Sequence, residues 1–98
     1  MRVEFDNAGD NNVIKVSGKI ASDNYMEFSN ELNSKELGDG VIVFDFHEMT
    51  YISSAGLRVL LSAQKVMNTQ GSMVVKNIND DIAEIFDVTG FSDLLTIE

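Results

Sequence analysis

The most constraining feature of the sequence is a run of bulky apolar residues, "VIVFDF" at 41–46, followed shortly by a long helix-like stretch. A continuous apolar run with β-branched side chains is typical of a strand that is covered on both faces. The segment from Ser54 to Gln70 has the periodicity of a helix, and Gly71 closes it. A buried strand that leads into a helix predicts an α/β fold with a largely parallel sheet and crossover helices.

The residues before this unit predict a hairpin and a first helix. "RVEF" (2–5) and "NVIKVSG" (12–18) alternate like strands, and the turn-forming residues between them favour a hairpin. Ser22 is predicted as the N-cap of a helix with Asp23 in its first turn. The apolar face of that helix carries Tyr25, Phe28 and Leu32, and "GDG" (38–40) ends it.

The residues after the long helix predict a strand, a third helix and a last strand. "SMVVK" (72–76) and "LLTI" (94–97) are the strand candidates. Asn79 is predicted to cap the helix between them, and Gly90 is predicted as its left-handed C-terminal residue, with Phe91 behind it. The predicted order is β-β-α-β-α-β-α-β. It describes one α/β domain spanning 1–98, with a mixed, mostly parallel sheet and about three flanking helices.

Composition limits the function. Ninety-eight residues leave room for one core and one site. Seven Lys and Arg against sixteen Asp and Glu give a net charge of −9, which disfavours direct binding to nucleic acid. The chain has no cysteine, no apolar run long enough to cross a membrane, no P-loop and no metal-ligand spacing. We therefore expect a cytoplasmic protein without cofactor or metal, which binds other proteins.

The long predicted helix has a narrow polar stripe and an otherwise apolar circumference. The stripe consists of Arg58, Ser62, Lys65 and Thr69. Such a helix is either wedged between the sheet and its neighbours, or it shows part of its apolar flank to a partner. The two interpretations are compatible, and the sequence leaves both open.

Two adjacent serines, Ser53 and Ser54, stand where this helix begins. On spacing alone, one of them is simply the N-cap. The alternative is an acceptor site, because a phosphate on Ser54 would meet the unpaired N–H groups of the helix N-terminus and could meet the guanidinium of Arg58 one turn later. The serines also follow the carboxyl end of the 41–46 strand, where functional loops of parallel sheets lie.

Two enzyme-like alternatives are weaker. A nucleophile elbow needs Gly-x-Ser-x-Gly, but Ile52 stands in place of the first glycine, and the only histidine, His47, lies on the same connection as Ser54. A receiver domain could use Asp45 and Lys76, but it needs an acidic cluster after the first strand, and "RVEF" has none after it. Asp45 is instead predicted to bond nearby backbone at the strand end. The chain is not expected to be an enzyme.

From "VSGKI" to its end, the sequence resembles the STAS domain of bacterial anti-sigma-factor antagonists. The most specific parts are the serine-glycine turn into a Leu/Val-rich helix and "IFDVTGF" (85–91). The resemblance implies a mixed sheet flanked by helices. It also implies that the unmodified protein binds a serine-kinase/anti-sigma factor, that the kinase phosphorylates a serine at the helix start, and that a PP2C-type phosphatase removes the phosphate.

The family motif Asp-Ser-Ser/Thr-Gly assigns the site residue by residue. Ser53 takes the aspartate place, Ser54 the acceptor place, Ala55 the third and Gly56 the glycine. Ser53 is the alternative acceptor, and Arg58 completes the implied partner-binding set. Ala21 stands at a second position where the family is often acidic, so that two negative charges are missing around the site. A STAS adaptor that regulates another signalling partner, such as a PP2C-type phosphatase, is the alternative function.

Overall fold

The computed structural model describes residues 1–8, 11–33 and 40–98, and these residues form a sheet with helices on one side. The chain runs through β1 (Arg2–Ala8), β2 (Asn11–Ile20), α1 (Tyr25–Asn33), β3 (Val41–Asp45), β4 (Met49–Ile52), α2 (Ser54–Gln70), β5 (Ser72–Lys76) and α3 (Asp80–Thr89), and ends with the short 3-10 helix η1 (Phe91–Asp93). The turn predicted between the first two strands (6–11) is too long, because residues 6–8 belong to β1 and Asn11 begins β2. Residues 9–10 and most of the "GDG" stop lie outside the described residues.

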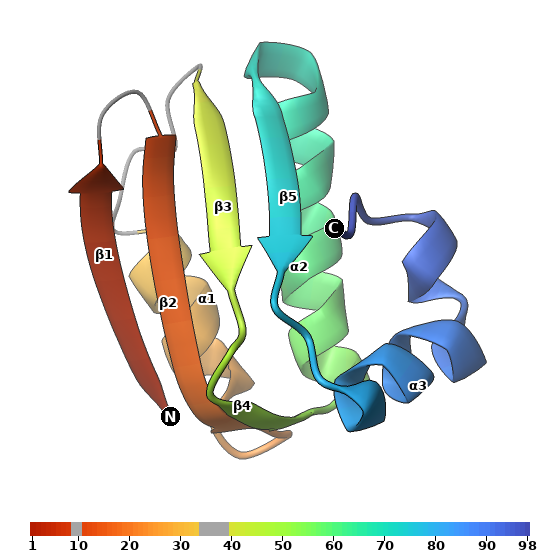
Figure 1. Cartoon of the computed structure of the whole chain (residues 1–98). Helices are drawn as coiled ribbons and strands as arrows, with labels where there is room; N and C mark the ends of the chain where they lie inside the picture. Colours follow the sequence, from red (N-terminus) through yellow and green to blue (C-terminus); the bar gives the residue numbers. More distant parts are fainter. Residues whose placement is uncertain (9–10, 34–39) are drawn as a thin grey trace.

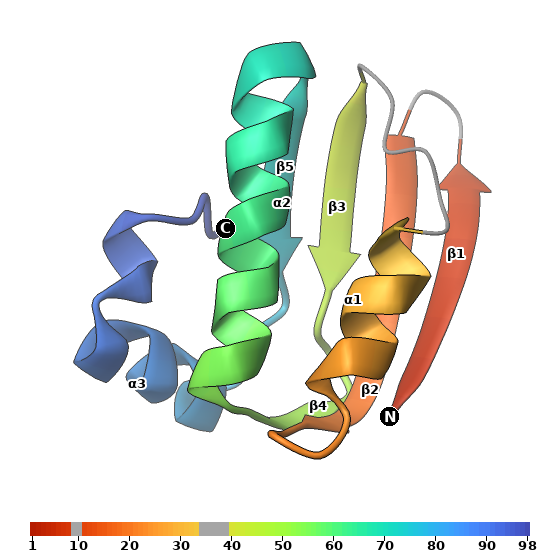
Figure 2. The ribbon, with the colours of Figure 1, turned by 180° about the vertical axis from the view of Figure 1, so that it is seen from behind.

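The sheet is mixed and mostly parallel, as predicted. Its order is β1-β2-β3-β5, with β1 antiparallel to β2 and the other pairs parallel. Figure 1 shows the sheet from its open face, and Figure 2 shows α1 and α2 lying across the opposite face. The third helix, α3, lies beyond β5 and α2 at one end of the molecule. The α/β class and the single antiparallel edge strand are confirmed.

The core lies between the sheet and the helices α1 and α2, and α3 adds Ile82 and Phe86 to it. Inward side chains of the strands meet the apolar faces of the helices, and the most completely buried ones are Phe28, Phe44, Phe46, Phe86, Ile14, Ile20, Ile42, Met49, Ile52, Leu57, Leu60 and Met67. Phe28 of α1 packs edge-on against Phe44 of β3, with ring centroids 6.3 Å apart. The predicted apolar face of the first helix is therefore confirmed.

The central strand β3 differs in one respect from its prediction, because helices cover only one of its faces. Successive side chains of a strand point to opposite faces, so Val43 faces the open side while Ile42 and Phe44 face the helices. Val43 is nevertheless only 9% exposed. In the register of the sheet it lies between Val13 of β2 and Val74 of β5, and these valines shield it. The continuous apolar run thus reflects shielding by neighbouring strands as well as by helices.

The structure contains a strand that the sequence did not predict, β4. It pairs with the last part of β2, whereas β3 pairs with the first part. Because β3 ends opposite Lys15, the last residues of β2 are free to pair, and β4 pairs with Gly18–Ile20. Thr50 is the extra residue of a bulge, since Gly18 pairs with Met49 and Lys19 with Tyr51. The sequence predicts no helix or strand for this segment, because four residues with one break in the alternation give almost no periodic signal.

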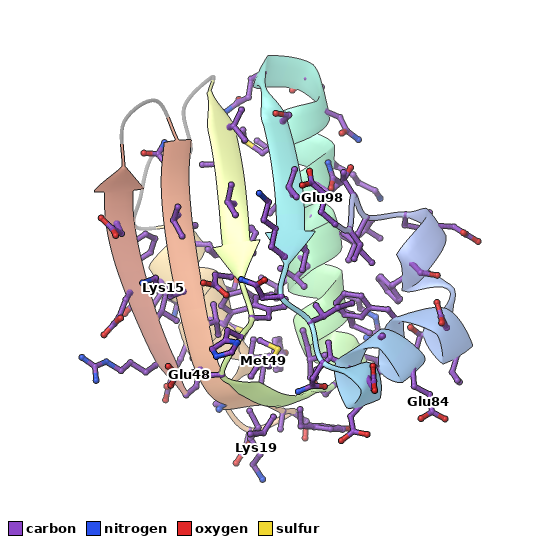
Figure 3. All side chains as sticks on the ribbon, in the orientation of Figure 1. Lys15, Lys19, Glu48, Met49, Glu84 and Glu98 are labelled. Atoms are coloured by element: carbon purple, nitrogen blue, oxygen red, sulfur yellow. The ribbon has the colours of Figure 1, made fainter. Side chains whose placement is uncertain are left out.

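Two asparagines hold the β3–β4 connection in place. The Nδ2 of Asn77, just after β5, donates to Oδ1 of Asp45 at 3.0 Å, and the Nδ2 of Asn79 donates to the carbonyl of Met49 at 3.0 Å. The backbone N–H of His47 also donates to Asp45 Oδ1 at 3.0 Å, which confirms that Asp45 bonds nearby backbone. In Figure 3, Glu48 and Met49 mark where this connection crosses from β3 to β4.

The same contacts set the ionisation of Asp45. Partial burial would raise the pKa of its carboxyl, but the hydrogen bonds from Asn77 and His47 and the nearby positive charges outweigh it and hold the pKa below its ordinary value of 3.8. The carboxylate therefore stays ionised, as an acceptor for both donors, at neutral pH. Because these hydrogen bonds hold the connection between β3 and β4 in one conformation, they also set the direction in which the chain enters β4.

Two predictions about element ends are wrong. The first helix begins at Tyr25 rather than just after Ser22, because the Asn24 side chain accepts from the N–H of Ala21 (2.7 Å) and donates to the carbonyl of Lys19 (2.9 Å). Asp23 consequently lies in the preceding turn. Serine and asparagine are both common N-cap residues, so the sequence alone does not show whether the helix begins after Ser22 or after Asn24. The conformation of the loop determines which of them it is.

The predicted last strand is reduced to one bridge. Ile97 pairs in parallel with Val75, while Leu94 still belongs to the turn that ends η1. Two backbone hydrogen bonds join this segment to Val75, at 2.8 and 2.9 Å. The buried Gln64 of α2 adds a third contact, because its Oε1 accepts from the N–H of Thr96 at 3.3 Å. By contrast, the caps at Asn79 and at Gly90, which has φ 79°, are as predicted.

Candidate functional site

The two serines lie where β4 runs into α2, at one end of the molecule (Figure 1). The N–H of Ser53 donates to the carbonyl of Ile20 at 2.7 Å, so the pairing of β4 with β2 extends into the start of the helix. The parallel strands β2 and β4 both end here, and functional loops of parallel sheets lie beyond the carboxyl ends of the strands.

Ser53 is the anchored serine of the pair. Besides the bond to Ile20, its Oγ accepts from the N–H of Gly56 at 3.3 Å, and its carbonyl accepts from the N–H of Leu57 at 3.0 Å. Its backbone is extended (φ −83°, ψ 169°), as expected for an N-cap. The structure thus decides between the two serines as the helix cap, and Ser53 is partly buried in that role.

Ser54 is the exposed serine of the pair. It is the first residue of α2, and its hydroxyl makes no hydrogen bond to any residue in the described parts of the chain. The first turn of α2 carries no acidic residue, whereas α3 has Asp80 and Asp81 in its first turn. The partial positive charge of the α2 N-terminus is therefore not offset by carboxylates on its own first turn.

Gly56 lies beneath the site rather than on its surface. It is buried, and a Cβ at this position would lie 2.7 Å from Cγ2 of Ile20 and 2.9 Å from Cγ1 of Ile52. The absence of a side chain lets α2 approach the ends of β2 and β4 closely. Gly56 therefore has a packing role in the site, and its place in the partner-binding set stays a prediction.

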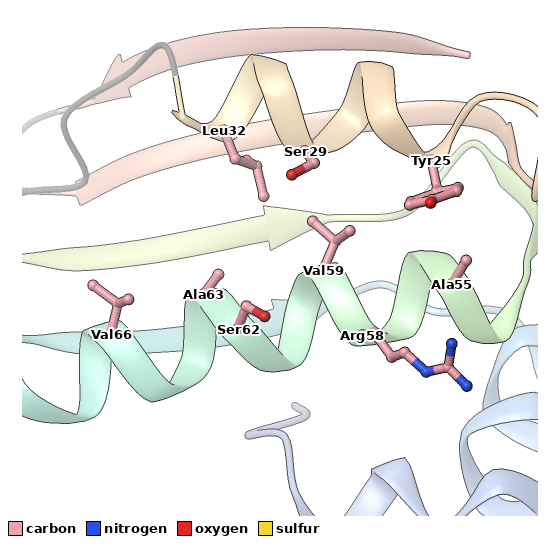
Figure 4. A pocket seen from close by; sticks show the side chains of 9 residues that line it. All are labelled: Tyr25, Ser29, Leu32, Ala55, Arg58, Val59, Ser62, Ala63 and Val66. Carbon is pink, nitrogen blue, oxygen red and sulfur yellow. The ribbon is translucent and has the colours of Figure 1, made fainter.

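The two other predicted site residues lie on α2 beside Ser54. Ala55 is partly buried, and Arg58 is exposed one turn further on. Arg58 forms no ion pair with any residue of 1–8, 11–33 or 40–98. In Figure 4 its side chain extends along the helix toward the N-terminal end, where Ser54 lies. Spacing of four residues brings Cβ atoms to about 5–6 Å, so Ser54 and Arg58 can share one ligand.

Sequence reasoning missed Tyr51 as part of this surface. Tyr51 lies three residues before Ser54 on β4 and is 46% exposed, which is unusual for a large side chain in a sheet. If β4 is recognised as a strand, its two apolar ends, Met49 and Ile52, are expected to face the core. Tyr51 between them is then expected to face solvent.

Of the residues behind the enzyme-like alternatives, Asp45 and Lys76 are cross-strand neighbours at the ends of β3 and β5, and Asp45 and His47 line the same hollow. His47 lines a hollow with Arg2 and Lys15 of the first two strands, whereas Ala55 and Arg58 line a different groove between α1 and α2. Among the described residues, no three carboxylate or histidine side chains are grouped as metal ligands. No helix in those same parts of the chain has the length and apolar character needed to span a bilayer.

Replacing Ser53 with alanine is expected to destabilise the fold, while replacing Ser54 is not. The Ser53→Ala change removes the cap bond to Gly56 and should lower the free energy of unfolding by about 1 kcal/mol. Ser54→Ala removes no hydrogen bond and should change it by less than about 0.5 kcal/mol. Urea unfolding followed by circular dichroism measures both, with Ser53→Asp as the control that retains a capping side chain. Equal losses for both alanine variants would contradict the assignment of the cap.

Comparison with known proteins places the chain in a family. Residues 2–98 match the STAS domain, and the chain belongs to that family. A curated relative is the putative anti-sigma factor antagonist BtrV of Bordetella bronchiseptica, which is 32% identical over 84% of this chain and 72% of its own length.

Solved structures support the same fold. An anti-sigma factor antagonist from Mycobacterium paratuberculosis has a TM-score of 0.87 at 14% identity, covering 98% of this chain and 83% of its own. The antagonist SpoIIAA in its unphosphorylated form has a TM-score of 0.78 at 12% identity, covering 99% and 88%. SpoIIAA of Bacillus in its phosphorylated form has a TM-score of 0.67 at 12% identity, covering 99% and 91%. At these identities the likeness concerns the fold.

Proposed function

We propose that this protein is an anti-sigma-factor antagonist whose unphosphorylated form binds a serine-kinase/anti-sigma factor, and that phosphorylation of Ser54 ends the interaction. The observation that carries the proposal is the exposed, unbonded hydroxyl of Ser54 at the helix start of a STAS domain. The name of the Bordetella relative supports the antagonist role, and the two forms of SpoIIAA support a phosphorylation switch.

The choice of Ser54 over Ser53 follows from their hydrogen bonds. A kinase must reach a hydroxyl and orient it toward the γ-phosphate, which Ser54 allows without loss of a structural contact. Phosphorylation of Ser53 would put a bulky group on the oxygen that caps α2 and would begin from a partly buried side chain. We therefore assign the modification to Ser54 and the cap to Ser53.

The switch acts through charge rather than through refolding. A phosphate adds about −1.5 to −2 charge at neutral pH and would lie at the uncompensated N-terminus of α2, within reach of Arg58. Both contacts stabilise the modified protein, so that its fold is retained. The partner meets a dianion where it previously met a hydroxyl, and a contact optimised for a neutral surface becomes unfavourable.

The roles assigned to other molecules follow from this proposal. The protein carries the regulated hydroxyl and supplies no catalytic group, while a serine kinase adds the phosphate and a PP2C-type phosphatase removes it. All three act in the cytoplasm. The net charge of −9 supports partners with basic or apolar docking surfaces rather than nucleic acid.

Co-expression with the small serine-kinase/anti-sigma proteins of the host tests the proposal. We expect a stable complex, a mass increase of one phosphate after addition of ATP, and fragment spectra that place it on Ser54. Ser54→Ala should abolish the mass increase, while Ser53→Asp, which keeps a cap, should retain it. A phosphate on Ser53, or a complex with a phosphatase and no kinase, would refute the assignment and would favour the adaptor function.

A further inference from the structure

A groove of about 410 Å³ runs between α1 and α2 on the helical side of the molecule (Figure 4). One wall is formed by Tyr25, Ser29 and Leu32 of α1. The other wall and the floor come from α2, with Ala55, Arg58, Val59, Ser62, Ala63 and Val66. The groove begins beside the serines and follows α2 away from them.

Small side chains keep the groove open. Ala55, Val59 and Ala63 follow one another at intervals of four residues, and they form a straight stripe on the side of α2 that faces α1. Ser29 faces them from α1, so at several levels a methyl or hydroxyl group stands where a larger side chain would close the gap. As a result Val66 remains 46% exposed, and Val59 is only partly buried.

The described lining of the groove carries a cationic side chain and no carboxylate, although the chain as a whole is strongly acidic. Among the described residues that line the groove, Arg58 is the only charged one, and Lys65 is exposed on the same helix. Neither cation forms an ion pair with a residue in the described parts of the chain. The sequence of α2 contains no Asp or Glu. The acidic residues of α1, Glu27 and Glu31, line a separate hollow with Met1 and Val3 of the N-terminal segment.

From this combination we propose that the α1–α2 groove docks an acidic amphipathic helical segment of a partner protein. Its apolar side chains would cover Tyr25, Val59 and Val66, and its carboxylates would pair with Arg58 and Lys65. A second copy of this chain is a poorer occupant, because two molecules of charge −9 repel each other. The stretch from Ala55 to Val66 is about 16 Å long, which a helix of roughly 12–14 residues covers.

The groove is also connected to the switch, and this connection rests on the proposed function. Arg58 is one turn from Ser54, so a phosphate on Ser54 competes with the docked carboxylate for the same guanidinium. Phosphorylation would then weaken the groove contact as well as the contact at Ser54 itself. Occupation of the groove does not depend on this coupling.

A pair of labelled helical peptides tests the docking site. Both have about 14 residues and the same leucine stripe, and one carries Glu at the polar positions while the other carries Lys. Fluorescence anisotropy with the full chain is expected to show at least about tenfold tighter binding of the Glu peptide. Amide chemical shift changes should map to α1 and α2. Equal binding of both peptides, or shift changes on the open face of the sheet, would overturn the proposal.

Variants separate the groove from general effects of charge. Val66→Glu places a negative charge in the groove and should weaken the Glu peptide at least about tenfold, while Val88→Glu, at a position of α3 that is 79% exposed, should not. Arg58→Ala should also weaken it several-fold. No difference between Val66→Glu and Val88→Glu would overturn the proposal, as would a dimer of the unmodified chain that Val66→Glu disrupts.

The coupling has a readout of its own. Ser54→Asp should weaken the Glu peptide in the normal chain and have little further effect in the Arg58→Ala background. If Ser54→Asp has no effect while the groove variants behave as expected, the docking site is retained and the coupling to Ser54 is rejected.

Discussion

Phosphorylation of Ser54 is expected to weaken binding of the serine-kinase/anti-sigma partner by about a hundredfold, and Ser54→Asp by about tenfold or more. Ser54 is exposed at the start of α2, in the surface that we propose faces the partner, so added negative charge would lie directly in the proposed interface. A penalty of about 3 kcal/mol corresponds to a hundredfold loss of affinity. Aspartate carries less charge than phosphate, and its effect should be smaller in proportion. Isothermal titration with the isolated partner measures these affinities.

Two controls make this result specific. Ser54→Ala should bind as tightly as the unmodified protein, because the hydroxyl makes no hydrogen bond to the described residues and its loss should leave the fold intact. Ser72→Asp adds the same charge at an exposed position at the start of β5, at the opposite end of the molecule, and should also leave binding unchanged. Indistinguishable affinities for Ser54→Asp and Ser54→Ala would exclude the charge switch.

Gly56→Ala is expected to destabilise the protein by about 1–2 kcal/mol, although alanine normally favours a helix. The new methyl group would lie 2.7 Å from Cγ2 of Ile20 and 2.9 Å from Cγ1 of Ile52, which is closer than carbon atoms approach. Both atoms belong to branched or buried parts of their side chains, so neither moves aside freely. Overpacking of this kind costs about 1–3 kcal/mol, and helix propensity returns about 1 kcal/mol at most. Thermal unfolding should show a midpoint lowered by about 4–15 °C.

A double-mutant cycle identifies the cause of this loss. Ile20→Ala removes the Cγ2 group that the new methyl would meet, so Gly56→Ala should cost at least about 1 kcal/mol less in that background. An unchanged cost would show that the loss has another origin. A Gly56→Ala variant as stable as the parent would refute the close approach of α2 to β2 and β4.

The sequence predicts elements well where a local pattern is strong. The strand in the run at 41–46, the seventeen residues of α2 and the Asn79 cap are each determined by side chains within one element. The structure confirms all three, with the strand ending at Asp45. Prediction fails where neighbours decide. β4 exists because β2 extends beyond β3, and the last strand shrinks to one bridge at Ile97 because η1 occupies the residues before it. Neither condition can be read from those residues alone.

The candidate site divides in the same way. Adjacent serines before an apolar helix, with an arginine one turn later, can be found by reading the chain, and so can the resemblance that assigns Ser54. Which serine caps the helix depends on a hydrogen bond from Gly56 and on the pairing of Ser53 with Ile20, which is 33 residues away. The requirement for glycine at position 56 depends on two isoleucines of other elements.

By itself, the sequence determined the alternation of strands and helices, the ends of α2 and the two hydroxyls at its start. These depend on periodicity and on side chains a few residues apart, which interact in the same way wherever the segment lies. Only the tertiary structure decided that one hydroxyl is held inside the cap and the other faces solvent. It also decided that α1 and α2 leave a groove, with an arginine at its edge that has no ion-pair partner among the described residues. Those properties arise from the packing of separate elements, and accessibility and charge pairing are defined only once that packing is complete.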